Sequence, residues 1–205
     1  MKEAKNILQK FWHLLWKDES WKGWVFSVVV LFIFIKFILF PTLSLVTGTA
    51  LPLAIVESCS MYHAGSALDF QNWWQPHDAK YTALEIAESQ FEKFPIPEGF
   101  NKGDILLIIK ANPDKLKIGD IIIFNANYQN PLIHRIIKIS EKDGKKIFST
   151  MGDNNNGQLG VEKEISEEQL VGKAVLRLVP FLGWGKLIFF EPLRPESEKG
   201  LCYQN

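Results

Sequence analysis

The feature that most constrains this chain is an apolar stretch from Trp24 to Val46, in which the polar residues are Ser27, Lys36, Thr42 and Ser44. A helix needs about 20 predominantly apolar residues to cross the hydrocarbon core of a bilayer. Lys36 is compatible with such a helix because its long stem lets the ammonium group reach the surface or a partner. Pro41 is expected to kink the helix or to end it. We predict one transmembrane helix over residues 24–46.

Residues 1–23 hold five lysines among apolar side chains, a pattern typical of a basic amphipathic helix on a membrane surface. A frayed polar leader is the alternative. No Lys or Arg occurs between Lys36 and Lys80. The positive-inside rule therefore places the N-terminus in the cytoplasm and the rest of the chain outside a cell membrane crossed once. A cleaved signal peptide ending near Gly48-Thr49-Ala50 is a second interpretation, although its apolar core is usually only about 7–15 residues long.

Beyond the apolar stretch, the pattern predicts a mostly β extracytoplasmic domain over residues 47–190. Short apolar or alternating runs separated by Asn, Asp and Gly are typical of strands; they cover 53–56, 104–110, 121–124, 132–139, 146–150 and 173–179. Residues 66–98 break this pattern and predict a helical insert, with near-helical spacing over 79–94. The insert is interpreted as a lid, a membrane contact or a docking site. Residues 191–205 predict a loose, polar C-terminal tail.

The bulk composition excludes some classes of protein. The 23 basic and 23 acidic residues balance, so there is no electrostatic case for a nucleic-acid partner. An aromatic content of 13% suits a protein at a lipid–water interface. Cys59 and Cys202 are far apart and do not form a disulfide framework, so a bridge between them is not expected. No metal-ligand spacing, phosphate loop or dinucleotide fingerprint is present, and no cofactor or metal is expected.

Ser60, shortly after the apolar stretch, is the candidate nucleophile. A serine hydroxyl needs a base to activate it and a third group to orient that base. His134 lies inside an apolar strand, where a core or surface histidine is the usual explanation, but a strand has the rigidity that a catalytic base requires. His13 lies on the leader and is excluded by the predicted topology.

Asp153 is the candidate orienting acid. It lies in Gly152-Asp153-Asn154-Asn155, a composition typical of a turn. A carboxylate held on such a loop can also accept the proton-bearing nitrogen of a histidine. The turn and the catalytic interpretation are compatible with each other.

Taken in order, these segments resemble type I signal peptidases of the archaeal and endoplasmic-reticulum type. The matching boxes are Ser58-Cys59-Ser60-Met61, Gly103-Asp104-Ile105, Gly119-Asp120-Ile121, His134-Arg135-Ile136 and Gly152-Asp153-Asn154-Asn155. The resemblance covers about residues 24–190 apart from the insert.

The resemblance implies a membrane-bound serine peptidase that removes signal peptides from exported preproteins. It makes Ser60 the nucleophile, His134 the general base and Asp153 the orienting acid, with Ser58 and the Ser60 backbone N–H as the oxyanion hole. The implied partners are signal peptides, membrane lipids and the protein-export machinery. Substrates would bind extended, with small side chains in shallow pockets.

The chain departs from the family pattern at Cys59, His63, Met151 and Leu159, and two of these departures bear directly on the chemistry. Cys59 replaces the usual glycine, and Leu159 stands where a second aspartate is common, which leaves Glu162 as the second candidate for the orienting acid. These departures keep open an alternative function, a catalytically impaired membrane-anchored binding subunit built on the same β-domain. A serine–lysine self-cleaving protease is disfavoured because a histidine, not a lysine, occupies position 134.

Overall fold

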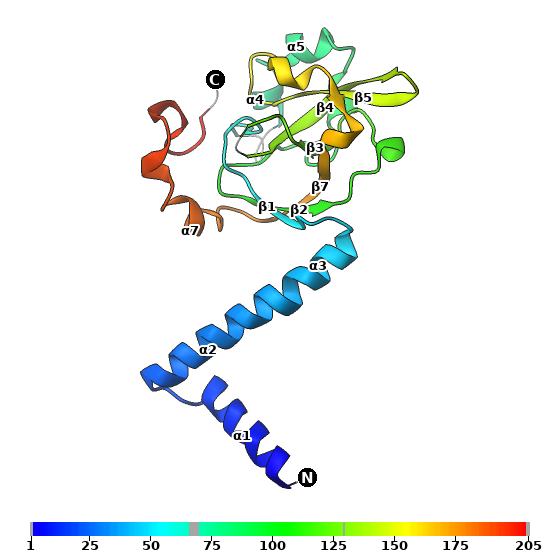
Figure 1. The fold of residues 1–205 in the computed structure, drawn as a ribbon. Coiled ribbons are helices and arrows are strands. Elements are labelled where there is room, and N and C mark those ends of the chain that lie inside the picture. Colours follow the sequence, from blue (N-terminus) through cyan, green and yellow to red (C-terminus); the bar gives the residue numbers. More distant parts are fainter. Residues whose placement is uncertain (1, 66–69, 129, 204–205) are drawn as a thin grey trace. The chain divides into compact units, whose positions relative to one another are not determined.

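The computed structural model describes residues 2–65, 70–128 and 130–203. The chain forms two compact units, Met1–Val46 and Thr47–Asn205 (Figure 1).

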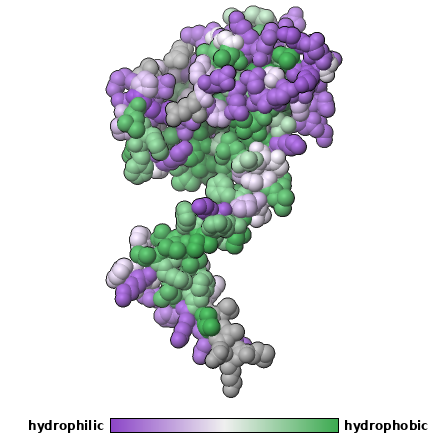
Figure 2. All heavy atoms as spheres, in the orientation of Figure 1, coloured by the Kyte–Doolittle hydropathy of each residue, from purple (hydrophilic) through white to green (hydrophobic). Residues whose placement is uncertain are grey.

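The first unit is helical. It contains α1 (Lys2–Trp16), α2 (Trp21–Phe34), the π-helical segment η1 (Ile35–Leu39) and the start of α3 (Phe40–Thr47). The hydroxyl of Ser20 accepts the backbone N–H of Gly23 and so caps the start of α2. From Trp21 to Thr47 the helix is continuous, and it is long and apolar enough to cross a membrane. Figure 2 shows the exposed apolar side chains along it.

Pro41 does not end this helix. Proline has no N–H to donate and its ring crowds the preceding turn, which breaks an ordinary α-helical ladder. Here the backbone widens just before Pro41: the N–H of Phe40 bonds to the carbonyl of Ile35, five residues earlier. A π-helical turn of this kind relieves the strain, so the helix continues to Thr47.

The second unit is built on a seven-stranded antiparallel sheet in the order β1-β2-β7-β3-β4-β5-β6. The strands are β1 (Leu53–Ile55), β2 (Ile105–Ile109), β3 (Ile121–Phe124), β4 (Leu132–Lys142), β5 (Lys145–Met151), β6 (Ile165–Ser166) and β7 (Leu170–Val179). The predicted mostly β class is confirmed. Strand β6 is absent from the sequence prediction because two residues are too few to show an alternating pattern.

Among the open strand edges of the described sheet, those of β1 and of the start of β4 concern the site. β1 is the first strand of the order and pairs only with β2. β4 pairs with β3 from Leu132 to Arg135, but its pairing with β5 begins only at Arg135. The first residues of β4 therefore present a second free edge.

The helical insert differs in detail from the expectation. Residues 66–69 lie outside the described part, and the rest forms three short helices, α4 (Phe70–Trp74), α5 (Asp78–Thr82) and α6 (Glu88–Phe91). The near-helical spacing over 79–94 predicts one helix, which is wrong because Glu85 adopts a positive φ of 61° and Ala87 is extended. The apolar side chains pack on Ile137 of β4 and Met151 of β5.

Short helical turns occupy several of the loops. They are η2 (Pro113–Lys115), η3 (Gly160–Glu162), η4 (Glu167–Gln169), α7 (Trp184–Leu187), η5 (Glu191–Leu193) and η6 (Glu196–Glu198). One of them, η3, carries a residue of the candidate site.

Candidate active site

Ser60 lies in a tight turn that follows β1. The N–H of Tyr62 bonds to the carbonyl of Cys59 and closes the turn. Met61, with 1% of its surface exposed, anchors the turn in the hydrophobic core. Asn154 clamps the turn from outside: its backbone N–H donates to the Ser60 carbonyl at 2.8 Å, and its side-chain Nδ2 donates to the Cys59 carbonyl at 3.1 Å. The backbone of the candidate nucleophile is therefore fixed on both sides.

Gly152 is required for this close approach of two loops. A Cβ atom added at Gly152 would lie 2.8 Å from the Ser60 carbonyl oxygen and 2.7 Å from Nδ2 of Asn155. Both distances are shorter than real Cβ contacts allow. The glycine of the Gly-Asp-Asn-Asn box thus serves packing against the nucleophile turn.

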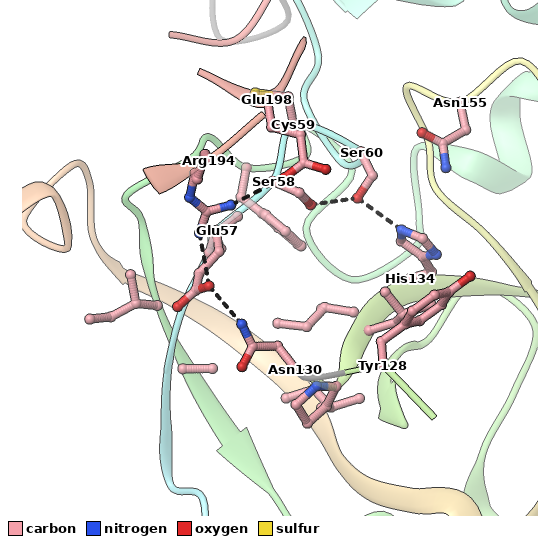
Figure 3. A pocket seen from close by; sticks show the side chains of 18 of the residues that line it. Glu57, Ser58, Cys59, Ser60, Tyr128, Asn130, His134, Asn155, Arg194 and Glu198 are labelled. Carbon is pink, nitrogen blue, oxygen red and sulfur yellow. Dashed lines mark hydrogen bonds and ion pairs between the residues drawn. The ribbon is translucent and has the colours of Figure 1, made fainter. Parts of the chain in front are cut away.

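His134 is held rigidly on β4, where it pairs with Ile122 of β3. It is buried, and its Nε2 atom lies 2.8 Å from Oγ of Ser60 (Figure 3). This is the distance of a good hydrogen bond. The structure therefore brings the predicted nucleophile and the predicted base together, although 74 residues separate them.

The other ring nitrogen of His134 contacts Glu162, not Asp153. Nδ1 of His134 donates to Oε1 of Glu162, which is fully buried. Oε1 also accepts from the Thr150 hydroxyl at 3.1 Å, and Oε2 accepts the backbone N–H of Leu159 at 2.7 Å. Because Nδ1 carries the ring proton and donates it in a hydrogen bond to the carboxylate, Nε2 is unprotonated and its lone pair points at the serine hydroxyl.

Asp153 belongs to a different cluster, which corrects the expectation from sequence. Its carboxylate accepts three hydrogen bonds from Arg135, the shortest 2.7 Å from Nη2. It also accepts from the Tyr81 hydroxyl at 2.9 Å and from Nε2 of His63 at 3.0 Å. The guanidinium of Arg135 points from β4 to the side away from His134, as neighbouring residues on a strand do, and captures Asp153 there.

This second cluster is buried and electrostatically coupled. Burial raises the pKa of Asp153, but the adjacent Arg135 charge and the hydrogen bond from His63 outweigh it and hold that pKa below its usual range. Burial lowers the pKa of His63, and burial together with the Asp153 charge raises that of Tyr81. Arg135 also donates to the carbonyls of Pro95, Gly119 and Ile96. The cluster thus ties the helical insert to the sheet.

An open groove of about 830 Å³ contains the Ser60–His134 pair. Residues 51 and 53–60, which include β1, and residues 130–134, which include the start of β4, form much of its lining. The free edges of β1 and of the start of β4 therefore lie along the groove. Ser58 also lines it, with its hydroxyl 3.1 Å from that of Ser60 (Figure 3).

The expectation that Cys59 and Cys202 stay unpaired is wrong. The two residues form a disulfide with Cα atoms 5.3 Å apart, although 143 positions separate them. Cys59 immediately precedes Ser60, so the bridge attaches the C-terminal residues to the nucleophile turn. Those residues are consequently not a loose tail.

The amino-acid sequence of this chain is similar to those of known proteins. The signal peptidase complex catalytic subunit SEC11C of human and of dog is 33% identical over 96 residues, which is 43% of this chain and 50% of the relative. SEC11 of Lachancea thermotolerans is 33% identical over 94 residues, or 42% of this chain and 55% of the relative. This chain is a homologue of signal peptidase catalytic subunits. The resemblance predicted from the sequence boxes is confirmed.

The similarity has defined limits. The match spans about half the length of these relatives. No protein-family model matches the chain.

In the described residues, no group of three or more His, Cys, Asp or Glu side chains is arranged to hold a metal ion.

Glu162 is the site residue that sequence reasoning ranks too low. The turn η3 brings its carboxylate back to the N–H of Leu159, three residues earlier. Leu159 stands where the family pattern leads one to expect an aspartate, and its backbone N–H binds the Glu162 carboxylate. The signal in the sequence is the spacing: Glu162 follows Leu159 by one 3₁₀ turn, and a glutamate has a longer side chain than an aspartate.

Proposed function

We propose that this chain is a membrane-bound serine endopeptidase that removes N-terminal signal peptides from exported preproteins. The observation that carries the proposal is the hydrogen-bonded series Ser60–His134–Glu162 in an open groove. The homology to signal peptidase catalytic subunits supports the substrate class.

In the proposed reaction, Oγ of Ser60 attacks the scissile carbonyl carbon while Nε2 of His134 takes the hydroxyl proton. The imidazolium then gives this proton to the leaving amine, and a water molecule hydrolyses the acyl-enzyme by the same route in reverse. Glu162 takes the orienting role that sequence analysis gives to Asp153. It holds the imidazole tautomer and stabilises the positive charge that forms.

The negative charge on the carbonyl oxygen also needs donors. We assign the Ser58 hydroxyl and the Ser60 backbone N–H to this oxyanion hole, because Ser58 lies at the groove beside the nucleophile. Removing one such donor typically costs a factor of about 10²–10³ in kcat.

The substrate is an extended polypeptide. Strand addition to an exposed edge supplies main-chain hydrogen bonds, while side-chain pockets supply specificity. The free edges of β1 and of the start of β4 both line the groove that holds Ser60, which supports this binding mode.

Membrane attachment places the enzyme where preproteins emerge. The helix Trp21–Thr47 is the proposed anchor, with the N-terminus in the cytoplasm and the peptidase domain outside the cell membrane. Within the domain, apolar side chains gather at the end of β7 and around α7 (Figure 2), among them the exposed Phe181, Leu182, Ile188 and Phe189. A patch of this kind suits contact with membrane lipids. Association with export machinery also belongs to the proposal.

The test is cleavage of a labelled preprotein by the purified full chain in detergent. Wild-type protein should release a mature fragment, and Ser60→Ala and His134→Ala should each abolish release while the protein still folds. Ser166→Ala, on edge strand β6, is the matched control and should cleave normally. Retained cleavage in either active-site variant would overturn the assignment.

The alternative is a catalytically impaired binding subunit, for which Cys59 and Leu159 are the sequence features. The Ser60–His134–Glu162 contacts favour the peptidase over it, because Glu162 supplies the carboxylate that position 159 lacks. A wild-type chain that binds the preprotein stoichiometrically but releases no fragment would favour the binding subunit.

A further inference from the structure

The C-terminal segment, residues Glu191–Tyr203, is fixed to the peptidase domain at both ends and in the middle. We call it the C-terminal strap. It contains the two short turns η5 and η6, and its composition is polar enough to predict a loose tail. Three sets of contacts with the rest of the domain hold it in place.

A buried lysine holds the middle of the strap. Lys102 has 1% of its surface exposed, and its Nζ atom donates to the Glu191 carboxylate at 2.6 Å and to the carbonyls of Glu198 at 2.7 Å and Gly200 at 3.3 Å. An ammonium group has three protons to donate. The strap accepts all three, so its path past Lys102 is fixed.

The ends of the strap are attached at the groove. Cys202 is bonded to Cys59, next to the nucleophile. The Tyr203 carbonyl accepts from Nδ2 of Asn154 at 3.1 Å, the same amide that clamps the nucleophile turn. Near the start, Nη2 of Arg194 donates to Glu57 at 2.9 Å (Figure 3).

This path leaves apolar side chains open to the groove. Leu201 and Tyr203 are 70% and 65% exposed, and both line the groove that contains Ser60, as does the exposed Tyr128. The backbone of these residues is already fixed, so binding a ligand against them costs less conformational entropy than ordering a free tail would. Groove-lining apolar surface beside a nucleophile suits the side chains of a polypeptide.

We propose that the C-terminal strap is a wall of the substrate groove, latched by the Cys59–Cys202 disulfide, and that Leu201 and Tyr203 contact the bound polypeptide. The inference rests on the proposed peptidase function and adds specificity-determining residues to it. The occupant is the extended substrate itself, because the groove is continuous with the Ser60–His134 pair and with the free edges of β1 and of the start of β4.

The experiment compares steady-state cleavage of fluorogenic peptides by the full-length wild type, Leu201→Ala and Tyr203→Ala. Leu193→Ala is the matched control, since Leu193 is also on the strap and 82% exposed but does not line the groove. Three peptides are used: one long on both sides of the scissile bond, one shortened on the amino side and one shortened on the carboxyl side.

For the long peptide, Leu201→Ala and Tyr203→Ala should each raise KM by about 10-fold with kcat unchanged, as expected for lost contact with a hydrophobic group. Leu193→Ala should match wild type. The effect should vanish for whichever shortened peptide no longer reaches the strap.

Two results would contradict the proposal that the C-terminal strap is a wall of the groove. One is an equal effect on all three peptides or in all three variants; the other is faster cleavage in Leu201→Ala, which would mean that the strap obstructs the groove. If wild type itself cleaves no peptide, the proposed function has failed instead.

The latch is tested by reduction. Incubation with a dithiol, which is oxidised to a cyclic disulfide as Cys59 and Cys202 become thiols, should raise KM for the long peptide in wild type. Cys202→Ser should already show the raised KM and should not respond to the dithiol; a response there would contradict the latch.

Discussion

Replacing Asp153 by asparagine should destabilise the peptidase domain by about 3–5 kcal/mol, because it leaves a buried guanidinium without its counter-charge. Asp153 and Arg135 are both 0% exposed, and the carboxylate accepts three of the hydrogen bonds that Arg135 donates. For a domain of this size, a loss of this magnitude lowers the unfolding temperature by about 6–20 °C. At a temperature where the variant is folded, kcat should stay within a few-fold of wild type, since Asp153 does not contact His134.

The assay for this prediction combines thermal unfolding with preprotein cleavage on the same samples. The low pKa of Asp153 fixes the sign of the pH dependence: the stabilisation is fully present above the ordinary aspartate pKa of about 4 and is lost as the pH falls below it. The difference in unfolding free energy between wild type and Asp153→Asn should therefore shrink in acid. An unchanged unfolding temperature with a kcat loss of several orders of magnitude would instead make Asp153 part of the catalytic machinery and would contradict its structural role.

Three further predictions concern the same loops. Glu162→Gln should reduce kcat by about 10⁴-fold, because an amide no longer fixes the His134 tautomer, while the unfolding temperature falls much less than in Asp153→Asn. Pre-steady-state cleavage and calorimetry check these two effects, and near-normal turnover would exclude Glu162 as the orienting acid. Gly152→Ala should lower kcat, since the added Cβ displaces the Ser60 carbonyl, and should cost about 1–3 kcal/mol of stability; both are read from cleavage and urea unfolding. Cys202→Ser should lower the unfolding free energy by about 2–5 kcal/mol, and wild type with reductant should unfold like the variant; identical curves with and without reductant would contradict the bridge.

The elements that dominate the fold follow from local pattern. Strand β3, Ile121–Phe124, is an unbroken run of β-branched and aromatic residues flanked by turn signals, and the structure has those same bounds. The helix from Trp21 to Thr47 follows from length and hydropathy. The insert is less predictable, because the positive φ at Glu85 arises from packing and has no glycine to mark it.

The site is predictable only in part. Ser60 and His134 stand in recognisable boxes, and their strand and turn settings bring them together. Successive side chains of β4 point to opposite faces, so His134 and Arg135 meet different acids. The aspartate of the Gly-Asp-Asn-Asn box binds Arg135, and a different acid contacts His134. Cys202 has no local signal at all, since its partner lies 143 positions away.

The central claim is that Ser60, activated by His134, cleaves preproteins at a signal-peptide boundary. The most direct measurement is the mass of the fragments released from a purified preprotein by wild type and by Ser60→Ala under identical conditions. We expect one mature fragment with a single new N-terminus for wild type and intact preprotein for the variant. The same fragment from Ser60→Ala, or intact preprotein with both, would contradict it.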